Sequence, residues 1–294
     1  MTSPGNLLLF GLGYTAELFC RRQLARGWKT RVIVRSEETR RRVESLGARP
    51  INVQDLDNVH KATSEANALL IVAPPSDGYC PGLQALSPAL SGRSHSQLRW
   101  IGYASSTAVY GDQKGAWTDE SSPLNTTSPT GLRRFEAERA WTALCGPARL
   151  PLVIFRLAGI YGPGRSALDR LREGRARRIE KNNHVLSRIH VEDLVSLLEA
   201  SLQRPNQHAI YNVCDDEPAS TADVVTFAAT LLGVEPPAAE PFESAVMSGA
   251  AERYFLESRR ISNSLAKKAL DWRPQYPSYR EGLIAIRKVE SARG

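Results

Sequence analysis

The segment from Ser128 to Glu138 departs from the catalytic motif that the neighbouring motifs predict for it. The motifs on both sides predict a Tyr-x-x-x-Lys pair there, in which a phenol exchanges a proton with the substrate and the lysine lowers the pKa of the phenol. Thr130 and Arg134 occupy those two positions instead. A threonine hydroxyl is a very weak acid and a guanidinium keeps its protons, so the usual proton donor is missing.

A glycine-rich turn near the N-terminus predicts the binding of a dinucleotide. It follows an apolar strand at 6–10 and opens a helix that ends at Gly27. The turn consists of Gly11, Leu12, Gly13, Tyr14, Thr15 and Ala16. In such a unit the first glycine allows the tight turn, the second lets the backbone approach the pyrophosphate, and a small third residue permits close packing. The phosphates would lie on the amides of the helix N-terminus.

The residue type after the second expected strand indicates the cofactor. An acidic residue there would bind the ribose hydroxyls of NAD, whereas Arg35 and Ser36 suit the 2′-phosphate of NADP. We therefore expect NADP, with NAD as the alternative; the non-functional interpretation of Arg35 is a solvated strand end. Asp55 is placed to reach the adenine amino group, and Ala73 and Pro74 would run along the cofactor.

The order of the elements predicts the fold class. Strands are expected at 6–10, 30–34, 49–53, 69–72 and 97–104, with helices between them. Later helices are expected at 221–232, 261–269 and 279–289, with a loop at 233–242. Alternation of strands and helices is typical of an α/β fold with a parallel sheet. The helix expected within 81–96 is shortened by its prolines and glycines.

Four motifs from residue 105 onward support one family. They are Ser105-Ser-Thr-Ala-Val-Tyr-Gly111, Arg156-Leu-Ala-Gly-Ile-Tyr161-Gly-Pro-Gly164, Arg188-Ile-His190-Val-Glu-Asp193 and Tyr211-Asn-Val213. In this order and spacing the series resembles the extended short-chain dehydrogenase/reductase superfamily. The G-x-G-Y-x-A opening looks like its atypical subgroup, described as NAD(P)-dependent epimerase/dehydratase-like. The resemblance covers nearly the whole chain.

The resemblance implies a fold and a division of the chain. The fold would be a Rossmann-type doubly wound parallel sheet of about seven strands with a small C-terminal substrate lobe. Residues 1–155 and 186–214 would form the NADP-binding domain, interleaved with a lobe of residues 156–185 and 215–294. Ser106 matches the family's serine or threonine that hydrogen-bonds a reacting oxygen. Thr130 and Arg134 match its tyrosine and lysine, and Arg134 could still bind ribose hydroxyls.

Two tyrosines are candidate substitutes for the missing acid. Tyr110 forms a literal Y-x-x-x-K with Lys114, but it lies on a loop after a strand, and packing under the sheet edge is the favoured alternative. Tyr161 also lies at a strand end near the expected cofactor. His190 is either an acid from the second lobe or, as we favour, a buried histidine that fixes a loop.

A run of cations lies in the expected substrate lobe. It comprises Arg165, Arg170, Arg172, Arg175, Arg177, Arg178 and Lys181. These side chains could recognise a phosphate or carboxylate of the substrate, or they could form a solvated helix face. Both interpretations stay open.

Composition limits the remaining classes of protein. Of the 294 residues 42% are hydrophobic and 23% are charged, as in soluble globular proteins. No apolar run approaches the roughly 18–20 residues that span a bilayer, and no signal peptide is visible. Four widely spaced cysteines suit a reducing cytoplasm and indicate neither disulfides nor a metal site. The net charge of +7 comes without a nucleic-acid-binding module.

These observations favour an NADP-dependent oxidoreductase that acts either as a reductase or in the manner of an epimerase. Its substrate would be a small anionic compound with a hydroxy, keto or imine group. Ser106 would orient the reacting group, and water, Tyr110 or Tyr161 would handle the proton. The alternative is a catalytically silent NADP(H)-binding sensor or structural subunit. The broken helix within 81–96 predicts a monomer, or a homodimer that uses another surface than the family's usual helix pair.

Overall fold

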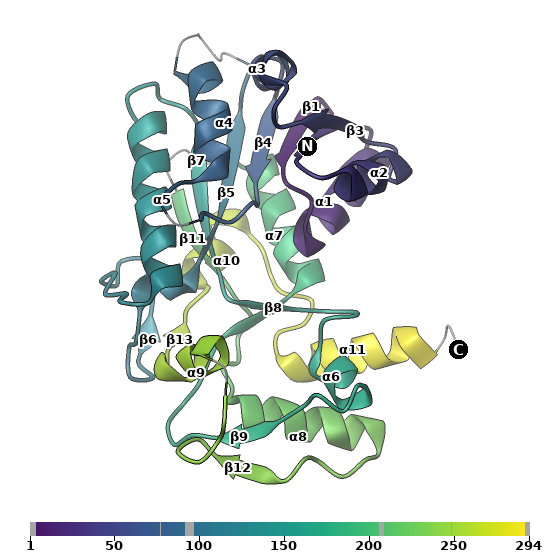
Figure 1. Ribbon diagram of the computed structural model, residues 1–294, viewed down its shortest axis with the longest axis vertical. Helices are drawn as coiled ribbons and strands as arrows, with labels where there is room; N and C mark the ends of the chain where they lie inside the picture. The colour runs from purple at the N-terminus through teal and green to yellow at the C-terminus, as the bar shows by residue number, and fades with distance from the viewer. Residues whose placement is uncertain (1–3, 77, 92–96, 206–208, 248, 292–294) are drawn as a thin grey trace. The chain divides into compact units, whose positions relative to one another are not determined.

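A seven-stranded sheet organises the fold, with the strand order β11-β7-β5-β4-β1-β2-β3 (Figure 1). In the computed structural model, residues 4–76, 78–91, 97–205, 209–247 and 249–291 are described. The strands are β1 (Asn6–Phe10), β2 (Lys29–Val34), β3 (Arg49–Asn52), β4 (Ala68–Ile71), β5 (Trp100–Ser106), β7 (Leu152–Leu157) and β11 (Ala209–Val213). Neighbouring strands from β3 to β5 pair in parallel. This confirms the expected doubly wound parallel sheet of Rossmann type, whose order reverses between β1 and β4.

Helices cover both faces of this sheet (Figure 1). They are α1 (Tyr14–Ala25), α2 (Glu37–Ser45), α3 (Leu56–Ser64), α4 (Pro81–Leu90), α5 (Pro129–Cys145) and α7 (Val191–Gln203). Strand β4 is buried at every residue, which is why it reads as a continuous apolar run rather than an alternating one. Helix α4 begins at a proline, contains Pro88 and has ten residues, as the sequence predicted; residues 92–96 lie outside the described part of the chain.

Gly82 allows α4 to pack closely on one face of the sheet. A Cβ atom at Gly82 of α4 would lie 2.8 Å from Ile71 of β4 and 3.3 Å from Trp141 of α5. Both neighbours belong to the buried apolar cluster of this face. On the other face the indole of Trp100 stacks on Phe19, 6.4 Å between ring centroids, and its Nε1 donates to Ser201 of α7 at 3.0 Å. The sheet and its helices are therefore tied together by aromatic side chains on both sides.

The chain divides into two units that interleave along the sequence. The first comprises residues 1–109, 129–156 and 195–211, and the second comprises residues 110–128, 157–194 and 212–294. These bounds differ from the expected ones, because 110–128, 186–194 and 212–214 belong to the second unit. The short strand β6 (Trp117–Thr118) explains the first difference, since it pairs in parallel with β13 (Arg260–Ile261). The second unit is also nearly as large as the first, rather than a small lobe.

The second unit combines helices with three short parallel strand pairs, β8–β10, β9–β12 and β6–β13. Its remaining elements are β8 (Gly159–Tyr161), α6 (Ala167–Arg172), β9 (Arg178–Glu180), β10 (Arg188–His190), α8 (Thr221–Leu232), β12 (Ala239–Pro241), α9 (Gly249–Leu256), α10 (Ser264–Leu270) and α11 (Tyr279–Ser291). The helix expected at 261–269 begins only at Ser264, because Ile261 belongs to β13 and Asn263 is the N-cap residue of α10, and the loop expected at 233–242 contains β12. Among the described helices, none has the length and apolarity needed to cross a membrane.

Candidate functional site

The glycine turn after β1 has the backbone that its sequence predicts. Gly11 has a φ of +93°, in the region that favours glycine, and a Cβ there would meet Ala73 N and Val72 at 3.4 Å. Gly13 precedes α1, which has no side-chain cap among the described residues, and a Cβ on Gly13 would meet nothing within 4 Å. Ala16 is completely buried. The backbone amides at the start of α1 are thus accessible, while the helix itself packs tightly at Ala16. This arrangement fits the pyrophosphate of a dinucleotide.

The segment after β4 lies against the same turn. The amide of Ala73 donates to the carbonyl of Phe10 at 3.2 Å, so Ala73 and Pro74 follow the end of β4 beside Gly11. This is the point at which the strand order reverses, where ligands of doubly wound folds bind. That both residues run along the cofactor stays a prediction.

A polar groove with a volume of about 590 Å³ runs along β3, from Arg49 at its start to the loops that follow β2 and β3. Its lining includes Arg35 and Ser36 from the loop after β2 and Asp55 from the loop after β3. The hydroxyl of Ser36 accepts from the amide of Thr39 at 3.3 Å and so caps α2. Arg35 is exposed and has no ion pair within the described ranges. The structure therefore brings the three residues predicted to bind adenosine into one groove.

Asp55 also has a structural role, in addition to its predicted contact with adenine, because it caps α3. Its carboxylate accepts from the backbone amide of Asn58 at 3.2 Å and from the side-chain amide of Asn58 at 2.7 Å, which caps α3. The side-chain bond from Asn58 holds the pKa of Asp55 below its usual range, so Asp55 is ionised at neutral pH. An ionised carboxylate is an acceptor for an amino group and not a donor.

The groove also contains cations that the sequence analysis did not single out. They are Arg31, Arg40, Arg49 and Lys61. With Arg35 the lining contains five cations and three acidic residues, so the groove has a net positive charge. Helical periodicity could have found Arg40, because it lies four residues after Ser36 and therefore near it on α2.

Ser106 lies at the carboxyl end of β5 and is half-buried. Its Oγ accepts from the amide of Ala108 at 3.2 Å. The hydroxyl hydrogen has no acceptor in the described part of the chain, so Ser106 can donate a hydrogen bond to a ligand. This is the capacity that its predicted role requires.

Thr130 and Arg134 lie on the first turns of α5 with different surroundings. Thr130 is exposed, and its Oγ1 accepts a long bond of 3.4 Å from Arg133. Arg134 is half-buried and donates through Nη1 to the carbonyl of Ala104 at 2.6 Å, with the hydroxyl of Tyr103 at 3.5 Å. The guanidinium is thus held at the end of β5, two residues before Ser106, whereas Thr130 has the surroundings of a surface residue.

The two candidate substitute acids are both buried and engaged. Tyr110 is fully buried and donates to Asn212 Oδ1 at 2.7 Å. Tyr161 donates to the carbonyl of Ser278 at 3.3 Å, and burial, together with Asp215, raises its pKa well above the usual range. Both hydroxyls thus already have partners within the protein, and the role of either tyrosine as the proton donor stays a prediction. The packing interpretation of Tyr110 agrees with its burial.

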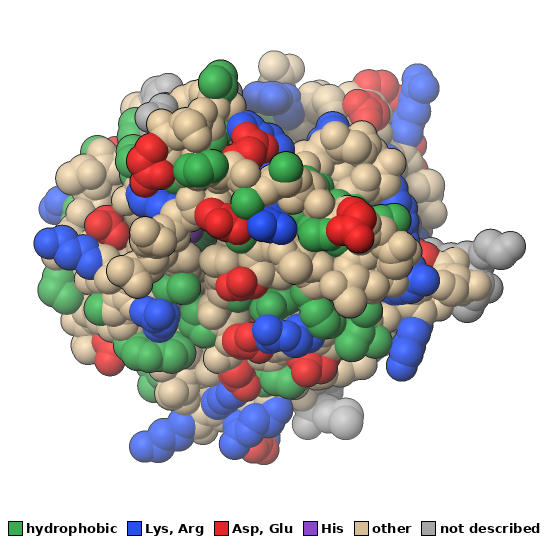
Figure 2. Space-filling view, turned by 90° about the horizontal axis from the view of Figure 1, so that it is seen from below, with side chains coloured by type: hydrophobic (Ala, Val, Ile, Leu, Met, Phe, Trp, Pro, Cys, Tyr) green, Lys and Arg blue, Asp and Glu red, His purple; other side chains and the backbone are tan. Residues whose placement is uncertain are grey.

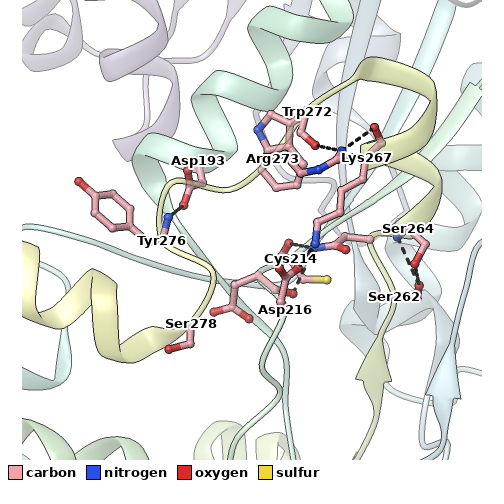
Figure 3. Close-up of polar contacts among 12 residues, drawn as sticks. Asp193, Cys214, Asp216, Ser262, Ser264, Lys267, Trp272, Arg273, Tyr276 and Ser278 are labelled. Atoms are coloured by element: carbon pink, nitrogen blue, oxygen red, sulfur yellow. Dashed lines mark hydrogen bonds and ion pairs between the residues drawn. The ribbon is translucent and has the colours of Figure 1, made fainter.

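His190 has the environment of a structural histidine. Its ring meets Tyr161 edge-on at 5.2 Å and Tyr276 at 4.4 Å between centroids, and Nδ1 accepts from the amide of Glu192 at 3.3 Å. Burial lowers its pKa to about 4, so it is neutral at physiological pH. Nearby, the carboxylate of Asp193 accepts from the amides of Gln275 and Tyr276 at 2.6 and 2.9 Å and fixes the segment before α11 (Figure 3).

The run of cations between 165 and 181 is mostly paired within its own unit. Arg172 pairs with Glu290 at 2.7 Å and Arg178 with Glu180 at 3.2 Å. Arg175 and Arg177 pair with Glu173 and Glu240, and Lys181 donates to the carbonyl of Phe255. On the molecular face drawn in Figure 2, positive and negative side chains are interspersed. These pairings favour the solvated structural interpretation over a substrate-binding cluster.

A buried charged network beside the site was missed by the sequence analysis. Glu138 of α5 accepts from Arg156 of β7 at both Nε and Nη2, with side chains only 6% and 4% exposed. Ser105, next to Ser106, donates to the same carboxylate. The network joins β5, β7 and α5 behind the residues that line the site. In the sequence, Glu138 and Arg156 appear only as separate motif residues, which gives no indication of their contact.

Comparisons with known sequences are consistent with this geometry. Residues 93–214 match the model of the NAD dependent epimerase/dehydratase family. The chain is 30% identical over 277 residues to protein YeeZ of Escherichia coli K12, an alignment that covers 88% of this chain and 94% of YeeZ. It is 29% identical over 175 residues to a 3-diazoavenalumate denitrifying reductase from a Streptomyces species, covering 56% of this chain and 57% of the reductase.

Solved structures extend the similarity over the whole fold. A functionally unknown conserved protein from Silicibacter pomeroyi is 41% identical, with a TM-score of 0.88 over 97% of this chain and 99% of the other. The dTDP-glucose 4,6-dehydratase of Bacillus anthracis, solved in complex with NAD, has a TM-score of 0.77 at 20% identity, with 98% of both chains covered. At that identity the second likeness concerns the fold alone.

Proposed function

Because this chain belongs to the NAD dependent epimerase/dehydratase family of extended short-chain dehydrogenases/reductases, we propose that it is an NADP-dependent reductase. It would reduce a keto or imine group of a small anionic substrate. The bound cofactor supplies the hydride. The observation that carries the proposal is that one unit combines the open glycine turn at Gly13 with the cationic groove at Arg35 and Ser36.

The charge of the groove supports NADP rather than NAD. The 2′-phosphate is the part of NADP that NAD lacks, and it carries negative charge that guanidinium groups bind well. Arg35 is exposed and has no ion pair within the described ranges, so binding the phosphate would break no existing pair. Ser36 is the N-cap residue of α2, and anions are stabilised near a helix N-terminus.

The surroundings of Thr130 support reduction rather than epimerisation. An epimerase must remove and return a hydride, and the same acid–base group serves both steps. Thr130 is exposed and has no accessible pKa for such a cycle. A reductase needs only one proton, which water can deliver. The Streptomyces relative is itself named a reductase, in agreement with this choice.

Within the proposed reaction, Ser106 donates a hydrogen bond to the oxygen or nitrogen that receives charge. Arg134, fixed on the carbonyl of Ala104, would contribute a permanent positive charge and would hold the ribose of the cofactor. The alternative function is a silent NADP(H)-binding sensor or structural subunit, which the absence of the tyrosine acid favours. Steady NADPH consumption with any member of a carbonyl and imine panel would separate the two.

Cofactor choice provides the direct test. We expect NADPH to bind more tightly than NADH, and Arg35→Asp to abolish or reverse the preference. Loss of a charged phosphate contact costs about 1.5–3 kcal/mol, on the order of 10- to 100-fold in affinity. Fluorescence titration with both cofactors measures it. Lys29→Asp, the same charge change at the other end of β2, is the matched control. Equal titration curves for both cofactors in the native protein would contradict the proposal.

Thr130→Val tests the proton route. We expect turnover to fall by no more than about fivefold, because one neutral hydrogen bond contributes about 1 kcal/mol. The reason is the exposure of Thr130 and the length of its hydrogen bond with Arg133, 3.4 Å. Steady-state kinetics and a cofactor titration measure turnover and affinity separately. A loss of several orders of magnitude in turnover, with cofactor affinity intact, would instead make Thr130 catalytic.

A further inference from the structure

The guanidinium of Arg134 has hydrogen-bond donors that its neighbours do not use. Both of its described bonds leave from Nη1, which donates to the carbonyl of Ala104 at 2.6 Å and lies 3.5 Å from the hydroxyl of Tyr103. Among the described residues, Nε and Nη2 have no acceptor and the side chain has no ion pair. A guanidinium carries its N–H donors in a planar fork, so most of that fork is available to a ligand.

Ser106 provides a second donor at the same end of β5. Its Oγ accepts from the amide of Ala108 at 3.2 Å, and its hydrogen has no acceptor in the described part of the chain. Arg134 is held on Ala104, two residues earlier in the strand, which is a spacing of about 6–7 Å along the backbone. A small ligand can therefore reach a neutral donor with one group and a permanent cation with another.

The replacement of the family's lysine by Arg134 changes what the positive charge can bind. An ammonium is a compact point charge, whereas the planar guanidinium matches the two oxygens of a carboxylate with two parallel hydrogen bonds. Thr130 lies one turn before Arg134 on α5, and therefore on the same face of the helix. A threonine at this position leaves space that the ring of a tyrosine would fill.

We propose that Arg134 binds a carboxylate of the substrate, so that the substrate class is a small keto or imino carboxylic acid. This inference rests on the proposed function, which it narrows from an anionic substrate to a carboxylic acid. Ser106 donates to the reacting oxygen or nitrogen, and Arg134 holds the carboxylate. One guanidinium balances the single charge of a carboxylate, whereas a phosphate monoester carries nearly twice that charge. The fork has enough donors for a ribose hydroxyl as well.

Matched pairs of unreactive probes test the inference without turnover. Oxamate and oxamide have nearly the same size and shape, but only oxamate has a carboxylate; N-phenyloxamate and its amide form a larger pair. Calorimetry measures the affinity of each probe for the native protein saturated with NADPH. We expect each acid to bind about 10- to 100-fold more tightly than its amide, as for one charge-assisted bidentate contact.

Variants assign this preference to the guanidinium. Arg134→Met should abolish it, and Arg134→Lys should keep only part of it, because an ammonium has the charge without the fork. The ratio of acid to amide affinity is compared within each variant at saturating NADPH, so a weaker hold on the cofactor does not affect it. Ser106→Ala should weaken acid and amide alike and leave the ratio unchanged.

Arg133→Met is the matched control on the same helix. Arg133 precedes Arg134 on α5, and its guanidinium donates to Thr130 at 3.4 Å rather than to the end of β5. Its replacement removes the same charge and should change the ratio by less than about twofold, the effect of a screened charge. Circular dichroism and thermal unfolding confirm that the variants are folded, and the ratio for the native protein depends on no variant.

The outcomes separate this inference from the function on which it rests. Equal affinities of the native protein for acid and amide, or an unchanged ratio in Arg134→Met, overturn the carboxylate site, while NADPH consumption with neutral ketones would keep the proposed reductase. Inorganic phosphate that binds more tightly than oxamate, and only with Arg134 present, overturns the choice of a carboxylate. A preference for the acid that depends on Arg134, without NADPH consumption by any keto or imino acid, supports the site and overturns the reductase.

Discussion

Glu138→Ala is expected to lower the free energy of unfolding by about 3–5 kcal/mol, the cost of breaking a buried ion pair by removing one partner. Arg156 remains behind with its guanidinium almost completely buried, and it loses the carboxylate that accepts from its Nε and Nη2. The hydroxyl of Ser105 loses the same acceptor. Because the three residues belong to α5, β7 and β5, the loss weakens the attachment of α5 to the sheet.

Urea denaturation followed by circular dichroism measures this loss. Glu136→Ala is the matched control, because it makes the same substitution on an exposed position of the same helix, where changes stay within about 0.5 kcal/mol. The double change Glu138→Leu with Arg156→Leu should recover much of the stability, since replacing both partners leaves no buried charge. Equal unfolding midpoints for Glu138→Ala and Glu136→Ala would show that the buried pair of Glu138 and Arg156 does not stabilise the fold.

Ser106→Ala is expected to reduce turnover by about 10²–10³-fold, as when one donor to a developing negative charge is removed. Cofactor affinity should stay unchanged, because the hydroxyl hydrogen of Ser106 is available for the substrate rather than engaged with a described residue. The expected signature is a fall in kcat with little change in the Kd of NADPH. Stopped-flow measurement of NADPH oxidation, combined with titration of the cofactor, gives both quantities.

Ser105→Ala distinguishes this role from a general disturbance of the strand end. Ser105 is adjacent, but it is buried and donates to Glu138, so its replacement should lower stability and leave turnover nearly native at a temperature where the variant is folded. Comparable losses of turnover in both variants would indicate that Ser106 acts through the strand rather than on the substrate.

The outline of the fold and the cofactor turn could be read from the sequence, because local physical rules specify them. Strand β4 is recognisable as a fully apolar run, and α8 has the expected bounds because Ser220 caps it and Gly233 ends it in a left-handed conformation. Gly11 requires a positive φ that other residues rarely adopt. Each of these signals involves neighbours in the chain, so a sequence pattern is sufficient to find it.

Only the tertiary structure decided what the polar side chains contact. Tyr110 and Tyr161 lie in motifs that allow either burial or catalysis, and their contacts with Asn212 and Ser278 bridge more than a hundred residues of sequence. Arg172 and Glu290 are equally distant. Such pairs have no periodicity, because they form where the packing of apolar surfaces brings distant segments together. The sequence therefore determined the sheet and the cofactor turn, and the packing of the folded chain determined which charged and phenolic groups remain available for chemistry.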